Sequence, residues 1–336
     1  MNPIIANDAA ISQAVDLLKA GALVAFPTET VYGLGADASN PDAVRRIFAA
    51  KGRPVDHPLI VHIPTIDSLE AWALSVPDTA RHLAAHFWPG PLAMILKKRP
   101  EVSLEVTGGQ DTVGLRMPDH PVALQLLQAF GGGVAAPSAN RFCRISPTLA
   151  SHVQEELGDA VDMILDGGAC QVGVESTIID LSGDQPMLLR PGHITREQIE
   201  AVLQCQLLVT AEAQQADVSE IRAPGMMAIH YAPTTPSLLC STASLPASVA
   251  ELVKQGKKLG LLTSQTDWVN NGALTAVIAM PIEADAYAQN LYSSLRDLDR
   301  LNLDIILVEQ PPQAEKWRAI NDRLAKATSV YSNVLG

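Results

Sequence analysis

The stretch FPTETVYGLG, residues 26–35, organises the rest of the chain. It closes an apolar run that begins at Ala22, places threonine hydroxyls after a proline, and ends in two glycines, where backbone can approach a ligand closely. KGRP follows at residues 51–54 and brings two cations one residue apart. If the intervening helix folds back, these cations face the hydroxyl groups. The pattern therefore predicts a polar pocket with local positive charge.

The composition is that of a globular protein large enough for two domains. The chain has 336 residues, of which 47% are hydrophobic and 18% are charged. No apolar run reaches the roughly 18 residues that a membrane span needs. The N-terminus lacks the basic and then apolar pattern of a signal peptide. We therefore expect a cytoplasmic protein that does not associate with membranes.

The cysteines and the charges exclude several classes of function. The chain has 4 cysteines and no CxxC pair, so neither a zinc site nor a disulfide framework is indicated. The net charge of −12 argues against stable nucleic-acid binding, which depends on many contacts between cations and phosphates. An anion site must therefore be local and built from a few converging cations.

The order of apolar segments predicts two domains joined by a linker. Over residues 1–205, short strands and helices mix without strict alternation, which favours an α/β or α+β domain with a twisted mixed sheet and flanking helices. Residues 206–236 are polar and rich in proline, and we interpret them as a linker that could act as a lid. Residues 237–336 hold two buried-strand patterns, at 258–263 and 304–309, alternating with helical segments, which predicts a small Rossmann-like parallel domain.

Single motifs leave alternatives open. GLGADA at residues 33–38 matches a dinucleotide-binding fingerprint, but six residues separate it from the preceding strand and the next helix begins only after Pro41. No P-loop motif is present. The KGRP cations could be a solvated helix terminus, and PSAN at residues 137–140 could be an ordinary turn. His62, among apolar neighbours, could be a core histidine.

The candidate polar residues are most informative as a set, because each lies at an end of a predicted strand. They are Thr30, His62, Arg116, Ser138, Asn140, Ser176 and Arg190. Hydroxyl, amide and guanidinium groups at one sheet edge suit a small anionic ligand together with a polyphosphate. No Ser-His-Asp order and no pair of acid–base carboxylates stands out, so the expected chemistry is positioning and charge stabilisation.

A series of these motifs, in order along nearly the whole chain, resembles the YrdC-type threonylcarbamoyl-AMP synthases. The matching segments are residues 27–35, 51–54, 57–62, 88–91, 116–118, 137–140 and 175–177. Residues 190–192, the Pro-Gly and His-Tyr-x-Pro elements of the linker, and residues 290–296 and 321–323 resemble the longer, two-domain subfamily. The resemblance implies a YrdC-like catalytic domain followed by a Rossmann-like one.

The resemblance also implies an activity and a site. The family makes L-threonylcarbamoyladenylate from L-threonine, bicarbonate and ATP, releases pyrophosphate, and supplies a downstream threonylcarbamoyl transferase complex that modifies tRNA. Threonine would be held by Thr30, His62, Arg116, Ala136 and Ser176. ATP would be held by Lys51, Arg53, His57, Thr112, Ser138, Asn140, Ser146, Arg190 and Tyr231. Lys51 and Arg53 would be the catalytic cations.

The resemblance implies Mg²⁺ bound through the ATP phosphates, with no protein ligand to the metal and no organic cofactor. Two other functions remain as alternatives: an RNA-binding module, and a carbamoyltransferase of a related family whose acylphosphatase and zinc-finger segments this chain lacks. The chain departs from the family at Cys143, where glycine is usual. If that position requires a positive φ, the cysteine costs about 1 kcal/mol.

Overall fold

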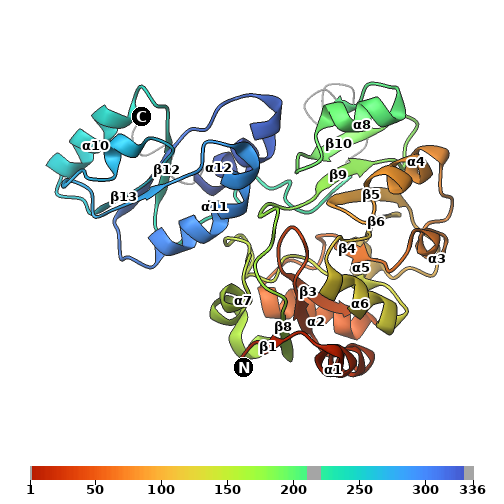
Figure 1. Ribbon diagram of the computed structural model, residues 1–336. Coiled ribbons are helices and arrows are strands. Elements are labelled where there is room, and N and C mark those ends of the chain that lie inside the picture. Colours follow the sequence, from red (N-terminus) through yellow and green to blue (C-terminus); the bar gives the residue numbers. More distant parts are fainter. Residues whose placement is uncertain (1, 210–220, 329–336) are drawn as a thin grey trace. The chain divides into compact units, whose positions relative to one another are not determined.

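The computed structural model describes residues 2–209 and 221–328 (Figure 1). It divides into two compact units. Unit 1 comprises Met1–Phe142 and Pro147–Met226, and unit 2 comprises Cys143–Ser146 and Met227–Gly336. The central part of the expected linker, residues 210–220, lies outside the described residues. Within the described part of the chain, no helix is long and apolar enough to cross a membrane.

An 11-stranded mixed sheet forms the centre of unit 1. From one edge to the other its strands are β1 (Ile4–Ile5), β8 (Met163–Asp166), β2 (Val24–Phe26), β3 (Gly33–Asp37), β7 (Val134–Ala135), β4 (Ile60–His62), β6 (Thr112–Arg116), β5 (Leu92–Lys97), β9 (Thr177–Asp180), β10 (Met187–Arg190) and β11 (Leu208–Val209). Strand β2 runs antiparallel to β3, whereas β4 runs parallel to β6. The prediction of a mixed sheet is confirmed.

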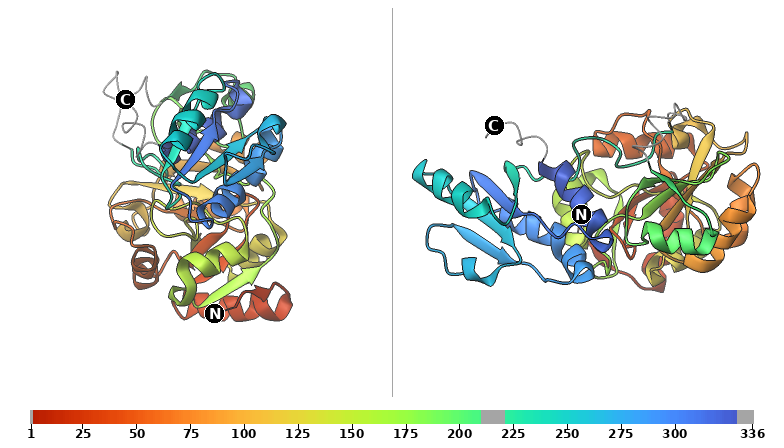
Figure 2. Two further views of the ribbon diagram at one scale, coloured as in Figure 1. Left: turned by 90° about the vertical axis from the view of Figure 1, so that its left-hand side faces the viewer. Right: turned by 90° about the horizontal axis from the view of Figure 1, so that it is seen from above.

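Helices cover one face of this sheet fully and the other face in part (Figures 1 and 2). The fully covered face packs against α2 (Pro41–Lys51), α4 (Asp78–Phe87), α7 (Ala150–Leu157) and α8 (Arg196–Leu203). On the other face, α1 (Asp8–Lys19) and α6 (Pro121–Phe130) pack together over β2, β7 and β8. Short helices lie at α3 (Leu69–Trp72) and α5 (Leu104–Thr107).

The rest of that second face has a different cover. Its apolar cluster combines residues of β4, β5, β9 and β10 with Ala223, and Ile221 and Met226 pack against it. Residues 221–226 of the linker therefore lie over the sheet where α1 and α6 do not. Arg222 fastens this segment by donating to the carbonyl oxygen of Gly108 at 2.8 Å, and Gln110 exchanges two hydrogen bonds with the Arg222 backbone.

Helix α2 places the KGRP cations. The Asn40 side chain accepts hydrogen bonds from the first turn of the helix, and Pro41 stands at its first position. Gly52 ends the helix in the left-handed conformation, with φ 62°. This turn brings the chain back toward the sheet, and Lys51 and Arg53 are both buried. A solvated helix terminus is therefore excluded.

The two glycines of residues 26–35 lie inside β3 and not in a loop. A side chain at Gly35 would meet Phe26 at 2.8 Å and Val134 at 2.9 Å. The expectation that this glycine opens backbone to a ligand is wrong, because neighbouring side chains fill the space. A dinucleotide-binding loop is excluded for the same reason, since that motif needs its glycines in the turn between strand and helix.

Unit 2 is a four-stranded parallel sheet with helices on both faces (Figures 1 and 2). Its strand order is β12 (Ser237–Cys240), β15 (Ile305–Glu309), β13 (Leu259–Thr263) and β14 (Ala276–Ala279). Its helices are α10 (Leu245–Lys254), α11 (Ala284–Asp299) and α12 (Arg318–Thr328). Leu259 and Leu261 face the cluster that contains α10, whereas Gly260 lies against Leu298 of α11. The prediction of a small Rossmann-like parallel domain is confirmed.

Candidate functional site

A tight turn follows β2 and fixes the threonine-rich segment. The Thr28 hydroxyl accepts from the backbone N–H groups of Thr30 and Val31, each at 3.2 Å, and donates to the carbonyl oxygen of Val31 at 2.6 Å. The Thr28 and Thr30 hydroxyls lie 2.8 Å apart. Threonine side chains commonly support turns in this way. The turn holds the hydroxyl of Thr30 in one place, close to the end of β6.

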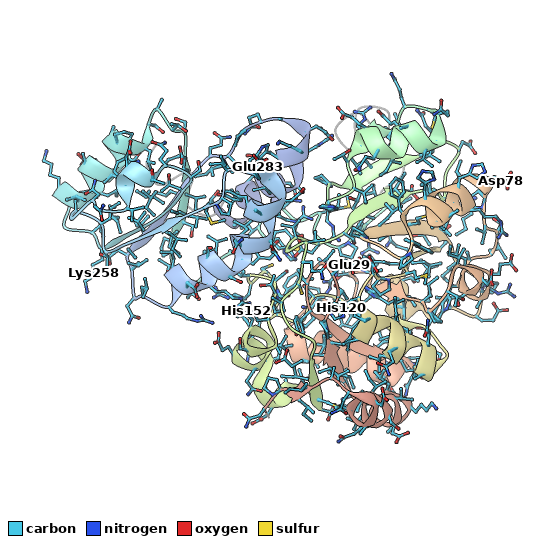
Figure 3. All side chains as sticks on the ribbon, in the orientation of Figure 1. Glu29, Asp78, His120, His152, Lys258 and Glu283 are labelled. Carbon is cyan, nitrogen blue, oxygen red and sulfur yellow. The ribbon has the colours of Figure 1, made fainter. Side chains whose placement is uncertain are left out.

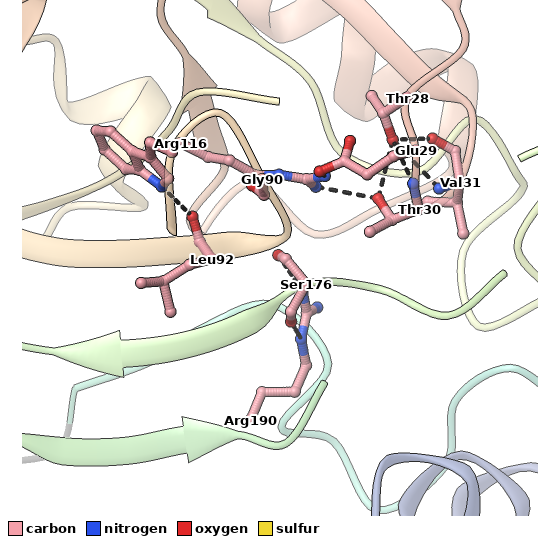
Figure 4. Close-up of polar contacts among 10 residues, drawn as sticks. Thr28, Glu29, Thr30, Val31, Gly90, Leu92, Arg116, Ser176 and Arg190 are labelled. Atoms are coloured by element: carbon pink, nitrogen blue, oxygen red, sulfur yellow. Dashed lines mark hydrogen bonds and ion pairs between the residues drawn. The ribbon is translucent and has the colours of Figure 1, made fainter. Parts of the chain in front are cut away.

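Arg116 ends β6 and reaches this turn (Figure 4). Its Nη1 donates to the Thr30 hydroxyl at 3.1 Å, its Nε donates to the carbonyl oxygen of Gly90 at 3.3 Å, and its Nη2 forms an ion pair with Glu29 at 2.6 Å. Both charged side chains are 5% exposed. Arg116 is therefore a buried, oriented cation and not a surface charge. Nη1 and Nη2 each carry a second N–H that could bind a carboxylate.

His62 ends the neighbouring strand β4 and pairs in register with Arg116. Its ring contacts Phe26 edge to face, with centroids 6.2 Å apart. Burial, together with the smaller effect of the Arg116 charge, lowers the pKa of His62 to about 3. His62 is therefore neutral at pH 7 and adds no positive charge beside Arg116.

Ser176, directly before β9, and Arg190, the last residue of β10, form a second contact pair (Figure 4). Arg190 donates from Nε to the carbonyl oxygen of Ser176 at 3.0 Å and from Nη2 to its hydroxyl at 3.1 Å. Nη1 donates to the carbonyl oxygen of Pro224 at 3.1 Å. Arg190 therefore connects an expected threonine ligand to Pro224 of the linker.

Lys51 and Arg53 contact backbone carbonyls and an aromatic ring. Lys51 donates to the carbonyl oxygens of Ser138 and, at 2.6 Å, of Asn140. Arg53 donates to the carbonyl oxygen of Pro58 at 3.0 Å, and its guanidinium carbon lies 6.0 Å from the ring centre of Phe142. These contacts orient both cations, and the partners in them, three carbonyl oxygens and an aromatic ring, are neutral.

His57 stands near Arg53. Its ring meets Phe142 edge to face, with centroids 5.4 Å apart. Burial lowers the pKa of His57, and the Arg53 charge acts in the same direction. The three groups Arg53, His57 and Phe142 therefore form one cluster at the end of α2.

The PSAN segment runs beside the stretch that organises the chain. Leu34 donates its N–H to the carbonyl oxygen of Pro137 at 2.7 Å, and Ala139 donates to that of Tyr32 at 2.8 Å. Ala136 donates to the carbonyl oxygen of Ile60 at 3.0 Å. Together with the Lys51 contacts, these bonds bring Ala136, Ser138 and Asn140 to the same region as the Thr30 turn. An isolated surface turn is excluded.

Thr112 begins the strand that Arg116 ends. Residues 112, 114 and 116 point to one face of the sheet, since side chains alternate along a strand. Gly114 lies between them and has no side chain. Four residues of strand separate Thr112 from Arg116 by roughly 13 Å. No hydrogen bond joins Thr112 to another candidate residue in the ranges that the structure covers. Thr112 lies at the end of β6 opposite to Arg116.

Ser146 and Tyr231 belong to unit 2, apart from the other candidates. The Tyr231 ring stacks on Tyr292, with centroids 5.9 Å apart, and the Arg323 guanidinium lies 5.2 Å from its centre. Beside Ser146, Arg296 donates to the carbonyl oxygen of Ile145, and Arg144 pairs with Asp299 at 3.1 Å. Residues 143–146 are therefore held by side chains of α11.

Cys143 has φ 63°, and Ala232 donates to its carbonyl oxygen at 2.9 Å. The position does adopt the left-handed conformation that favours glycine. The sequence-based concern about this loop is confirmed.

The sequence analysis missed two contributors to the Arg116 environment. Glu29 lies within the quoted stretch but received no role, because a single acid gives no pattern. Gly90 contributes a backbone oxygen, and its loop follows a cis peptide bond between Trp88 and Pro89. The WPGP motif at residues 88–91 was the available signal, but a motif does not reveal which backbone oxygen will face a cation.

The structure offers no ready protein site for a metal. In residues 2–209 and 221–328, no group of three or more His, Cys, Asp or Glu side chains could hold a metal ion. A cation that enters with a polyphosphate would take its ligands from the phosphate oxygens and water.

Comparison with known proteins identifies both parts of the chain. Residues 16–192 match the family model described as "Telomere recombination", and residues 194–329 match that of the threonylcarbamoyl-AMP synthase C-terminal domain. A threonylcarbamoyl-AMP synthase of Bacillus subtilis is 42% identical, across 96% of this chain and 93% of the relative. The enzyme of the same name from Schizosaccharomyces pombe is 39% identical, across 91% and 85%.

Solved structures agree. Sua5 of Pyrococcus abyssi in complex with L-threonine superposes with a TM-score of 0.88 at 40% identity, covering 95% of this chain and 94% of that one. A variant of the same protein, in which a histidine and the following tyrosine are replaced by alanine, gives a TM-score of 0.86 at 38% identity, covering 98% and 97%. The expected family and fold are confirmed. The chain belongs to the threonylcarbamoyl-AMP synthases, nucleotidyltransferases of the form that carries a second, C-terminal domain.

Proposed function

We propose that unit 1 joins L-threonine, bicarbonate and ATP into L-threonylcarbamoyladenylate and releases pyrophosphate. The observation that carries this proposal is the buried Arg116, which Thr30, Gly90 and Glu29 hold in one orientation at the end of β6. A family member of known structure, Sua5 of Pyrococcus abyssi, has been solved in complex with L-threonine. An oriented guanidinium with unused N–H groups suits the carboxylate of that amino acid.

The proposed reaction begins with the threonine amine and bicarbonate, which form N-carboxythreonine and water. The carbamate oxygen then attacks the α-phosphorus of ATP, and pyrophosphate leaves. Arg116 binds the threonine carboxylate, with Thr30, His62, Ala136 and Ser176 completing that subsite. Because His62 is neutral, it can accept or donate a hydrogen bond without competing for the carboxylate as a second cation.

The nucleotide would lie along β6 from the Thr112 end. Lys51, Arg53 and Arg190 would offset the charge of the triphosphate and the charge that develops on pyrophosphate. His57, Ser138 and Asn140 of unit 1 would complete the nucleotide subsite, and the roles of Ser146 and Tyr231 of unit 2 stay predictions from the sequence resemblance. Holding the carbamate and the α-phosphate in line raises their effective concentration.

Two further parts of the proposal concern the metal ion and the exclusion of water. Mg²⁺ would arrive on the phosphates of ATP and reduce their repulsion. Residues 221–226, which lie over the sheet and accept a bond from Arg190, would exclude water from the labile carbamate and adenylate.

We propose a cytoplasmic reaction whose product passes to a threonylcarbamoyl transferase complex for tRNA modification. The net charge of −12 supports small-molecule synthesis over stable RNA binding. A filter-binding assay with tRNA at physiological salt separates the two functions, because an RNA-binding module would retain tRNA without ATP or threonine.

The activity is tested by incubation with ATP, Mg²⁺, bicarbonate and each amino acid in turn, followed by mass spectrometry for an aminoacyl-carbamoyl adenylate. We expect the threonine product alone to accumulate. Arg53→Ala should abolish threonine-dependent pyrophosphate release, whereas Arg81→Ala, which removes a half-exposed arginine paired with Glu70, should not. Turnover of Arg53→Ala within about tenfold of the parent would contradict the role given to Arg53.

A further inference from the structure

Glu29 is a buried acid that contacts Arg116, the cation of the proposed threonine subsite. It is 4% exposed, and its Oε1 pairs with Arg116 at 2.6 Å. Its Oε2 has no hydrogen-bond partner among the residues that the structure describes. Buried polar atoms in native proteins nearly always have a partner, so an unsatisfied carboxylate oxygen calls for an explanation.

The backbone around Glu29 is fixed on both sides. The Thr28 hydroxyl accepts from the backbone N–H groups of Thr30 and Val31. Val172 donates its N–H to the Glu29 carbonyl oxygen at 2.7 Å. Gly173 donates to the Thr30 carbonyl oxygen at 3.2 Å. The carboxylate is therefore held beside Arg116 by the fold, and Figure 4 shows the two groups facing each other.

Neighbouring titratable groups do not satisfy Oε2. The charge of Glu29 raises the pKa of both His120 and Cys170. Burial has the larger effect at both: it lowers the pKa of His120 and raises that of the Cys170 thiol. Neither group donates a hydrogen bond to Oε2. Figure 3 marks Glu29 and His120 within unit 1. A donor on a bound ligand would supply the missing partner of Oε2.

The charges of this pair complement those of a free α-amino acid. Threonine carries a carboxylate and an ammonium group on the same carbon, and the site presents a guanidinium and a carboxylate side by side. A carboxylate ligand on Arg116 would meet repulsion from Glu29 unless the ligand also brought a positive group. The zwitterion supplies that group at the correct place.

We propose that Glu29 binds the α-ammonium group of threonine through Oε2, and so makes the site selective for free amino acids over other hydroxy acids. This inference rests on the proposed function. It adds a substrate-binding residue to the threonine subsite and explains why a buried acid stands beside the cation that binds the substrate carboxylate.

The test compares the parent protein with Glu29→Gln by isothermal titration calorimetry. Three ligands separate the roles: L-threonine, 3-hydroxybutanoate (threonine without its amino group) and L-threoninamide (threonine without its carboxylate). We expect Glu29→Gln to bind L-threonine and L-threoninamide about 10- to 100-fold more weakly, as for the loss of one charge-assisted hydrogen bond. It should bind 3-hydroxybutanoate as well as the parent or better, because the repulsion is gone.

Each outcome decides a different question. If Glu29 only orients Arg116, threonine and 3-hydroxybutanoate will weaken together while threoninamide is unaffected, and the inference is overturned. It is also overturned if threonine affinity changes less than about threefold. If the parent protein binds no threonine, the proposed function fails instead. Glu309→Gln, which alters a buried glutamate of unit 2, is the matched control, and thermal melting confirms that each variant is folded.

Discussion

Glu29 in unit 1 and Glu309 in unit 2 are both buried glutamates, and they differ in how their oxygens are satisfied. In unit 2, Oε1 of Glu309 accepts from Thr242 at 2.7 Å and from Gln265, and Oε2 accepts from Thr263 at 2.5 Å and from the Ser264 backbone at 3.1 Å. In unit 1, Glu29 has one ion pair and one oxygen without a partner in the described ranges.

The difference separates a structural polar cluster from a binding one. A carboxylate whose bonds are all internal stabilises its own fold and has nothing left to offer a ligand. A carboxylate that keeps an oxygen unsatisfied destabilises the empty site and gains when a donor arrives. By this criterion, we interpret the polar strand ends of unit 1 as a ligand site and the polar cluster around Glu309 in unit 2 as part of the core.

The largest expected effect comes from breaking the charge pair in unit 1. Arg116→Met removes the carboxylate-binding group, and we expect threonine affinity to fall more than about 100-fold. Glu29 then remains in the interior without its counterion, which lowers the free energy of unfolding by about 3–5 kcal/mol. Calorimetric titration and chemical denaturation measure the two effects.

A double variant sharpens this result. Glu29→Leu combined with Arg116→Met removes both charges, so stability should largely recover while threonine binding stays lost. If Arg116→Met alone bound threonine within about threefold of the parent, Arg116 would not be the clamp and the contrast with Glu309 would lose its functional meaning.

The sequence predicted this site in part, for identifiable physical reasons. Strand ends and helix caps follow from local patterns, so Arg116, Ser176 and Arg190 could be assigned to a shared sheet edge before any coordinates. The ion pair of Glu29 with Arg116 joins residues distant in sequence, and no local pattern predicts such a pair. The packing of Phe26 and Val134 around Gly35 is likewise a tertiary effect, and it reversed the interpretation of that glycine.

The division of the chain into two units could also be predicted only in part from the sequence. Composition predicts a change of character after residue 205, but it cannot show that residues 143–146 join the unit formed by the C-terminal part. That association depends on Arg144, Arg296 and their partners Asp299 and Ile145. Side chains on a helix more than a hundred residues away in the chain determine it.

An intermediate effect is expected at the other glutamate. In Glu309→Gln, the amide nitrogen cannot accept the hydrogen bonds that a carboxylate oxygen accepted, so a buried donor is left unsatisfied. We expect the free energy of unfolding to fall by about 1–3 kcal/mol, with threonine affinity unchanged. Glu251→Gln, at an exposed position of α10, should stay within about 0.5 kcal/mol. A loss of threonine affinity in Glu309→Gln would show that the unit 2 cluster is not purely structural.

The smallest effect concerns the loop that unit 2 holds. Cys143 has φ 63°, a conformation that costs a residue with a Cβ about 1 kcal/mol and costs glycine nothing. Cys143→Gly removes that strain but also loosens the unfolded chain, by about 0.4–1 kcal/mol. The net change from the parent should therefore be close to zero. Cys143→Ala loses the thiol and keeps the strain, so the glycine variant should equal or exceed the alanine variant in chemical denaturation. An alanine variant clearly more stable than the glycine variant would mean that the hydrogen bond from Ala232 and the Arg144 ion pair do not hold this loop in the left-handed conformation.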